Sequence, residues 1–103
     1  MYKLCVFIPE SQVEAVKLAM FEAGAGRIGD YDRCSWQTLG EGQFRPLDGS
    51  NPYIGQQGKV EKLIEYKVEM VCENDRIKAV IAAMKSAHPY EEPAYDVWQL
   101  ADV

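Results

Sequence analysis

The ten residues from 88 to 97, HPYEEPAYDV, constrain the fold more than any other part of this sequence. Two prolines lie four positions apart, after a stretch with helical spacing and before one that alternates. Proline ends a helix, and it biases the residue before it toward extended backbone. The segment therefore predicts the end of a helix, a rigid turn and the start of a strand, which fixes the organisation of the last third of the chain.

Composition narrows the class of protein. The chain has 103 residues, 48% of them apolar, and a formal net charge of −5 from 16 acidic and 11 basic residues. Nucleic-acid binders need clustered cations, so we expect no nucleic-acid partner. No apolar run approaches the ~18 residues of a membrane span, and the start lacks a signal-peptide pattern, which predicts a cytoplasmic protein without a membrane partner. The three cysteines have no CxxC spacing and are predicted to be free thiols that pack in the interior.

Glycine placement divides the chain into regular flanks and a loop-rich middle. All eight glycines lie between Gly24 and Gly58, and glycine loosens backbone order more than any other residue. Before them, alternating apolar residues predict a strand over residues 2–8. Ser11 and Glu14 then have the spacing of a capping box, which predicts a helix that continues until the first glycine.

The remaining pattern completes a recognisable order. Strand-like composition predicts strands over residues 31–39, 59–72 and 94–100. A second helix, with Asn74 or Asp75 as its cap, is predicted between the last two strands. Its apolar stripe comprises Ile77, Val80, Ile81 and Met84. The order β-α-β-β-α-β is the split arrangement of ferredoxin-like domains. We therefore predict an α+β ferredoxin-like sandwich in which two helices cover one face of a four-stranded antiparallel sheet.

That topology leaves one sheet face without a helix. The first and third strands would be central neighbours, and large apolar groups would point to the uncovered face. The candidates are Cys5 and Phe7, with either Trp98 and Leu100 or Tyr95 and Val97. Because exposed apolar patches favour association, we predict a homo-oligomer formed through the open face or the sheet edges. The alternative is that the long glycine-rich segment folds back over the face.

Four segments carry a family resemblance that covers nearly the whole chain. They are FEAGAGRIGDYD at residues 21–32, GQFRPL at 42–47, NPYIG at 51–55 and HPYEEPAYD at 88–96. The chain resembles the inserted domain of the Nif-three-like (YqfO-type) proteins, which is similar to the PII signalling proteins and the CutA-type divalent-cation-tolerance proteins. Those proteins are ferredoxin-like and usually trimeric. The resemblance implies a single PII/CutA-like domain over residues 1–103 and a trimer or dimer.

The same resemblance argues against catalysis. In full-length family members, His, Asp and Glu residues of a larger domain hold paired metal ions. This chain has one histidine and no HxH or HxxxE-type cluster, so the dinuclear site has no counterpart. We therefore carry over no catalytic residue and no metal site, predict no cofactor, and favour a role other than that of an enzyme.

A glycine-rich motif and the single histidine could each be interpreted as a ligand-binding feature. Residues 24–29 satisfy GxGxxG, but they follow a predicted helix, whereas a dinucleotide-binding loop follows a strand. We interpret them as a helix end and a turn, from which Arg27 remains available to a ligand. His88 lies within about 20° of the apolar stripe on a helical wheel and is predicted to pack. Its alternative role is a metal or anion site shared with Glu91 or Glu92.

The irregular stretch over residues 40–58 is the predicted place of specific function, because loops longer than ~15 residues in compact domains are usually functional or disordered. With the 88–93 turn it is predicted to form a surface for a protein partner or a small anionic metabolite. The candidate residues are Arg27, Phe44, Arg45, Asn51, Tyr53, His88, Tyr90, Glu91 and Glu92. We favour an oligomeric binding or regulatory module. The alternatives are a CutA-like divalent-metal-binding protein and the detached regulatory part of a split Nif-three-like metal hydrolase.

Overall fold

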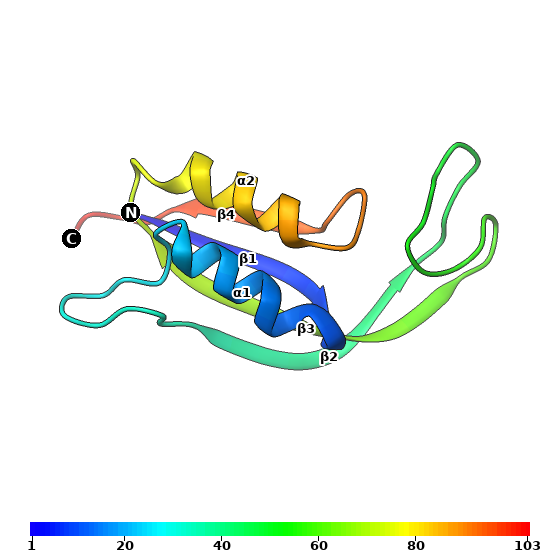
Figure 1. Cartoon of the computed structure of the whole chain (residues 1–103), viewed down its shortest axis with the longest axis horizontal. Coiled ribbons are helices and arrows are strands. Elements are labelled where there is room, and N and C mark those ends of the chain that lie inside the picture. Colours follow the sequence, from blue (N-terminus) through cyan, green and yellow to red (C-terminus); the bar gives the residue numbers. More distant parts are fainter.

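The computed structural model describes all 103 residues and contains one four-stranded sheet and two α-helices. The elements in chain order are β1 (Tyr2–Pro9), a 3-10 turn η1 (Glu10–Gln12), α1 (Val13–Glu22), β2 (Trp36–Phe44), β3 (Glu61–Cys72), α2 (Ile77–Ala87) and β4 (Tyr95–Gln99). The strand order is β2-β3-β1-β4, and every neighbouring pair is antiparallel. Both helices lie on the same face of the sheet (Figure 1). The predicted ferredoxin-like α+β fold is confirmed.

The core lies between the sheet and the helices. Alternation along β1 sends Leu4, Val6 and Ile8 toward the helices, where none of them is exposed to solvent. They pack against Val68 and Met70 of β3 and against buried residues of both helices. The predicted apolar faces of β1, β3 and α2 are therefore the faces that the structure buries.

Neither helix has the predicted side-chain cap at its start. The Ser11 hydroxyl donates to the side-chain oxygen of Gln12, at 2.6 Å, and not to the first turn of α1. In α2 the N-cap position belongs to Arg76, so neither Asn74 nor Asp75 caps that helix. The capping predictions are wrong because a 3-10 turn leads into α1 and a turn leads into α2, which displaces the polar side chains from the cap positions.

The end of α1 is as predicted. Gly24 has a φ of 115°, a conformation that favours glycine. Its N–H donates to the Phe21 carbonyl at 3.0 Å, and the N–H of Ala25 donates to the Met20 carbonyl at 3.1 Å. These two bonds form a Schellman motif. The GxGxxG sequence thus ends a helix.

The second strand lies further along the chain than predicted. The sequence predicted a strand over residues 31–39 and irregular structure over 40–58, whereas β2 includes Gly40 and Gly42. The glycines are tolerated because β2 pairs with β3 along its whole length. The irregular segment between the two strands therefore covers residues 45–60, and we call it the 45–60 loop.

The hairpin of β2 and β3 extends beyond both helices and carries the 45–60 loop at its end (Figure 1). The molecule measures 46 × 25 × 24 Å along its principal axes. Strand β2 has no buried residue, whereas five of the eight residues of β1 are buried. The longer helix, α2, has only 11 residues, and neither helix has the length and apolar character needed to cross a membrane.

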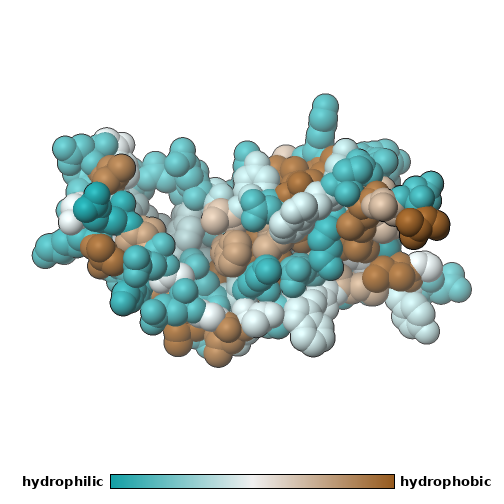
Figure 2. All heavy atoms as spheres, turned by 180° about the vertical axis from the view of Figure 1, so that it is seen from behind, coloured by the Kyte–Doolittle hydropathy of each residue, from teal (hydrophilic) through white to brown (hydrophobic).

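The strand register settles which residues point to the uncovered sheet face. Lys3 pairs with Trp98, so Trp98 lies on the same face as Cys5 and Phe7, whereas Tyr95 and Val97 pack against the core. Viewed from behind, the molecule shows apolar and polar groups interspersed across its surface (Figure 2). Of the two predicted alternatives, the structure thus selects Trp98.

Candidate functional site

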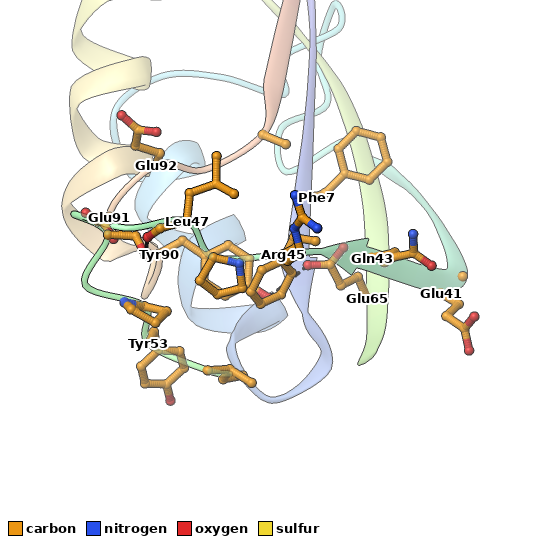
Figure 3. Close-up of a pocket in the computed structure, with 18 of the residues that line it drawn as sticks. Phe7, Glu41, Gln43, Arg45, Leu47, Tyr53, Glu65, Tyr90, Glu91 and Glu92 are labelled. Carbon is orange, nitrogen blue, oxygen red and sulfur yellow. Dashed lines mark hydrogen bonds between the residues drawn. The ribbon is translucent and has the colours of Figure 1, made fainter. Parts of the chain in front are cut away.

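A cleft of about 650 Å³ lies at the end of the open sheet face that is nearest the 45–60 loop. Three parts of the chain line it. The sheet contributes residues that include Phe7 and Glu65, the loop contributes residues between 44 and 54, and the turn after α2 contributes residues between 90 and 94. Figure 3 shows these side chains around the hollow. Segments far apart in the sequence thus share one concave surface.

The loop and the turn are held together by direct contacts. The backbone N–H of Asn51 donates to a carboxylate oxygen of Glu91 at 2.7 Å. The ring of Tyr90 lies 5.9 Å from that of Phe44 and 6.4 Å from that of Tyr53, centroid to centroid, which is the range of favourable aromatic pairs. Most of the predicted site residues therefore meet around Tyr90.

Tyr90 is anchored to the sheet through its hydroxyl, which donates to the Glu65 carboxylate at 2.9 Å. Burial, and then the Glu65 carboxylate that accepts this hydrogen bond, raises the pKa of Tyr90 well above its usual range. The Glu65 side chain lies over Gly42, where a Cβ atom would collide with the carboxylate. The absence of a side chain at Gly42 therefore gives Glu65 the room to reach Tyr90.

His88 supports the turn from behind. It is 6% exposed, and its Nε2 lies 2.8 Å from the Phe7 carbonyl, while its Nδ1 accepts the Tyr90 N–H at 3.1 Å. Because a carbonyl only accepts and an amide only donates, the ring carries its proton on Nε2. Burial lowers the pKa of His88, which favours this neutral form. Both nitrogens are occupied by backbone groups, so His88 braces Tyr90 and does not face the cleft as a ligand.

The charged candidates have different locations. Arg45 and Glu92 line the cleft and are exposed. Arg27 lies in the loop before β2, at the other end of the molecule from the 45–60 loop (Figure 1). There it lines a smaller hollow of about 290 Å³ with residues that include Arg76. Arg27 is therefore the one predicted site residue that the fold separates from the others.

Sequence reasoning missed several residues that line the cleft. Glu65 and Lys67 lie on the open face of β3, and Leu47 comes from the loop. Charged residues that alternate with apolar ones in a strand look like an ordinary solvated face, so the sequence carried no signal for them. Phe7 was predicted to lie on the open face, and it lines the cleft as well.

Metal-ligating and nucleophilic residues are dispersed. No group of three or more His, Cys, Asp or Glu side chains is placed to hold a metal ion. All three cysteines are free, and Cys5 and Cys72 are buried. Burial raises the pKa of both buried thiols, which keeps them protonated and unreactive at neutral pH.

Comparison with known proteins identifies relatives that are much longer than this chain. It is 49% identical over 98 residues to a Mycobacterium leprae protein named GTP cyclohydrolase 1 type 2 homolog, and 45% identical over 102 residues to the protein of that name from Halalkalibacterium halodurans. The alignments cover 95% and 99% of this chain but 26% and 27% of those proteins. The chain thus spans about a quarter of their length. No protein-family model matches it.

Two kinds of solved structure superpose on this chain, a NIF3-related protein and CutA proteins. A Bacillus cereus protein related to NIF3 superposes with a TM-score of 0.84 at 39% identity, over 98% of this chain and 26% of that one. The periplasmic divalent cation tolerance protein CutA from Archaeoglobus fulgidus superposes with a TM-score of 0.70 at 15% identity, over 100% of this chain and 87% of that one. The second likeness concerns the fold alone.

Proposed function

We propose that this chain is a small oligomeric binding or regulatory module. The premise is its close similarity to a segment of NIF3-related proteins, which its motifs predicted. The proposal treats residues 1–103 as one PII/CutA-like domain that has no catalytic activity of its own. The cleft between the 45–60 loop and the turn after α2 is the observation that carries it. Its volume lies within the range of small-molecule sites in proteins.

The construction of the cleft supports binding. Its walls come from a loop and a turn, but Tyr90 attaches the turn to Glu65 of the sheet, and Glu91 of the turn holds the loop through the Asn51 N–H. Such attachment holds the aromatic groups in place before a ligand arrives, which reduces the entropic cost of binding. A binding surface on loops that a rigid sheet positions is a common arrangement in proteins.

The protonation states of the groups in and behind the cleft support a role without catalysis. Tyr90 keeps its proton far above neutral pH, and both nitrogens of His88 are bonded to the backbone. A general acid or base works best with a pKa near the working pH and a free path to the substrate. Neither residue meets both conditions.

The open face supports self-association with a second copy of the chain. Trp36 and Trp98 are 69% and 48% exposed on this face. The same face carries Lys3 together with Glu69, so two copies placed face to face can match opposite charges. Burying each large side chain would contribute about 1.5 to 3 kcal/mol. Sedimentation that shows only an 11.6 kDa species at micromolar concentration would contradict the association.

A second candidate function is favoured by the lengths of the alignments. The chain matches about a quarter of proteins named GTP cyclohydrolase 1 type 2 homolog over nearly its own whole length. The module would then regulate a NIF3-related metal hydrolase, either as part of the same polypeptide or as a detached subunit. The test is to mix the chain with a NIF3-related protein that lacks this segment and to look for a complex by size-exclusion chromatography.

Thermal unfolding with a panel of compounds tests the proposed binding function. The panel contains nucleotides, 2-oxo acids, aromatic acids and divalent metal ions. We expect at least one class to stabilise the chain saturably, by about 2.7 kcal/mol when its concentration is 100 times Kd. Turnover of any of these compounds by the purified chain would contradict the proposal, because the module would then be an enzyme. Location in the cytoplasm is part of the proposal and is tested by fractionating cells.

A further inference from the structure

We propose that the cleft binds a small molecule that carries a flat aromatic ring and a carboxylate. This inference rests on the proposed binding function and names the class of its ligand. It follows from three features of the cleft: an open floor, aromatic walls, and two cations without partners.

The floor is open at Gly40. A Cβ atom added there would meet no other atom within 4 Å, so the space above this part of β2 is free. The rings of Phe7, Phe44 and Tyr90 line the same cleft. A flat ring that lies over the bare glycine backbone would contact these side chains from the side or in an offset stack, which are the favourable geometries for aromatic pairs. The floor and the walls thus suit a planar apolar group.

Two cations of the cleft have no partner in the chain. Arg45 and Lys67 both line it, whereas the one ion pair of the structure joins Lys17 to Glu14 elsewhere. Lys67 pairs with Phe7 across β1 and β3 on the open face, so it lies next to the aromatic wall that Phe7 forms. An arginine fork binds a carboxylate through two parallel hydrogen bonds, and a lysine adds a point charge. The free donors therefore suit a carboxylate.

The four glutamates that line the cleft do not neutralise Arg45 and Lys67. The carboxylate of Glu65 accepts the Tyr90 hydroxyl, and that of Glu91 accepts the Asn51 N–H. Figure 3 shows Glu41 and Glu92 at opposite sides of the cleft, with their carboxylates directed outward. The carboxylates of Glu65 and Glu91 are engaged in hydrogen bonds that hold the cleft together, and those of Glu41 and Glu92 point away from it. The charges that remain available to a bound molecule are therefore those of the two cations.

Three indole compounds test the ligand class, because they share one ring and differ in charge. They are indole-3-acetate, the neutral indole-3-ethanol and the cationic tryptamine, each titrated into the ¹⁵N-labelled chain and followed by amide NMR shifts. We expect indole-3-acetate to shift the amides of residues 40–54 and 90–94 saturably. Indole-3-ethanol should bind about a hundredfold more weakly, since it loses the charge-assisted interactions with both Arg45 and Lys67, and tryptamine more weakly still.

Matched variants locate the site. Gly40→Val adds a branched side chain over the floor, and its Cβ would meet no atom within 4 Å, so it should keep the fold and weaken binding of indole-3-acetate at least about tenfold. Leu39→Val, its neighbour on the other side of β2, is the control and should leave binding unchanged. Arg45→Gln should weaken indole-3-acetate about tenfold and leave indole-3-ethanol unaffected.

Several results would overturn the inference. Tryptamine binding as tightly as indole-3-acetate, or Arg45→Gln weakening the acid and the alcohol equally, would reject the carboxylate while leaving the proposed binding function in place. Full binding by Gly40→Val would reject the site. If the indoles cause no shift but another compound of the thermal panel binds, the ligand class alone is wrong. Silence of the indoles and of the whole panel would remove the proposed small-molecule function as well.

Discussion

The two ends of the sheet differ in how deeply their residues are buried. In the body, where the helices cover β1, burial dictates the sequence, and Leu4, Val6 and Ile8 are fully enclosed. In the arm formed by β2, the start of β3 and the 45–60 loop, no residue of β2 is buried. The arm nevertheless carries two aromatic residues of the cleft, Phe44 and Tyr53, and an unpaired arginine. The contrast teaches that the buried residues of the body maintain the fold, whereas the exposed residues of the arm and of the open face are free to serve the binding that we propose.

Leucine substitutions in the body and in the arm are expected to differ most in the free energy of unfolding that they remove. Leu4→Ala removes a completely buried side chain and should lower the free energy of unfolding by about 2 to 5 kcal/mol. Leu39→Ala removes a side chain that is 57% exposed and should cost no more than about 0.5 kcal/mol. Urea denaturation measures both. Equal losses would break the comparison, because the arm would then contribute to stability as the body does.

A pair of glycine substitutions sharpens the comparison inside β2. Gly42→Ala places a Cβ against the Glu65 carboxylate, so Glu65 must move from the Tyr90 hydroxyl, at a cost of about 1 to 3 kcal/mol. Gly40→Ala meets no atom and should leave stability unchanged or raise it by roughly 0.5 to 1 kcal/mol. Thermal and urea unfolding would show the sign. A destabilised Gly40→Ala variant would mean that the floor of the cleft is not open.

Acid should loosen the turn that joins the body to the cleft. Burial lowers the pKa of His88 in the folded chain below the 6.5 of a free histidine, so the unfolded chain binds the proton more tightly. The stability that this residue contributes is complete above about pH 6.5 and is lost as the pH falls toward its folded pKa. Stability measured from pH 8 to pH 5 should therefore fall more steeply for the wild type than for His88→Gln. Parallel curves would show that His88 does not titrate in this way.

Thiol accessibility gives a smaller but simple contrast. Cys5 is 1% exposed and its pKa is raised by burial, whereas Cys34 is only half-buried in the loop before β2. Because the thiolate is the reactive form, iodoacetamide should label Cys34 first, and mass spectrometry would identify the modified residue. Faster labelling of Cys5 would indicate that the open face of the body is less closely packed than the structure shows.

The body could be predicted from the sequence and the arm could not, for physical reasons that the residues make plain. Alternation identified β1 because one of its faces is buried, and the apolar stripe identified α2 for the same reason. In β2 neither face is buried, and Gly40 and Gly42 resemble a loop, so the strand was placed too early. The cap predicted at Ser11 was wrong because local pattern does not show the 3-10 turn that precedes α1.

The site was predictable only in part. Aromatic residues and rigid turns indicated the 45–60 loop and the turn after α2, and the structure places Phe44, Tyr53 and Tyr90 together. Glu65 and Lys67 could not be identified, because their role depends on which strand faces the loop. Arg27 lies in the glycine-rich motif at residues 24–29, and the topology places that motif at the other end of the molecule from the cleft.

The double variant Arg45→Gln/Lys67→Gln tests most directly whether the exposed cations of the cleft serve binding and not stability, with unfolding and binding measured on the same preparation. Both side chains are exposed and neither pairs within the chain. We predict an unfolding free energy within about 0.5 kcal/mol of the wild type and an affinity for indole-3-acetate lower by about a hundredfold. A variant that loses several kcal/mol of stability and still binds the acid as the wild type does would contradict the account.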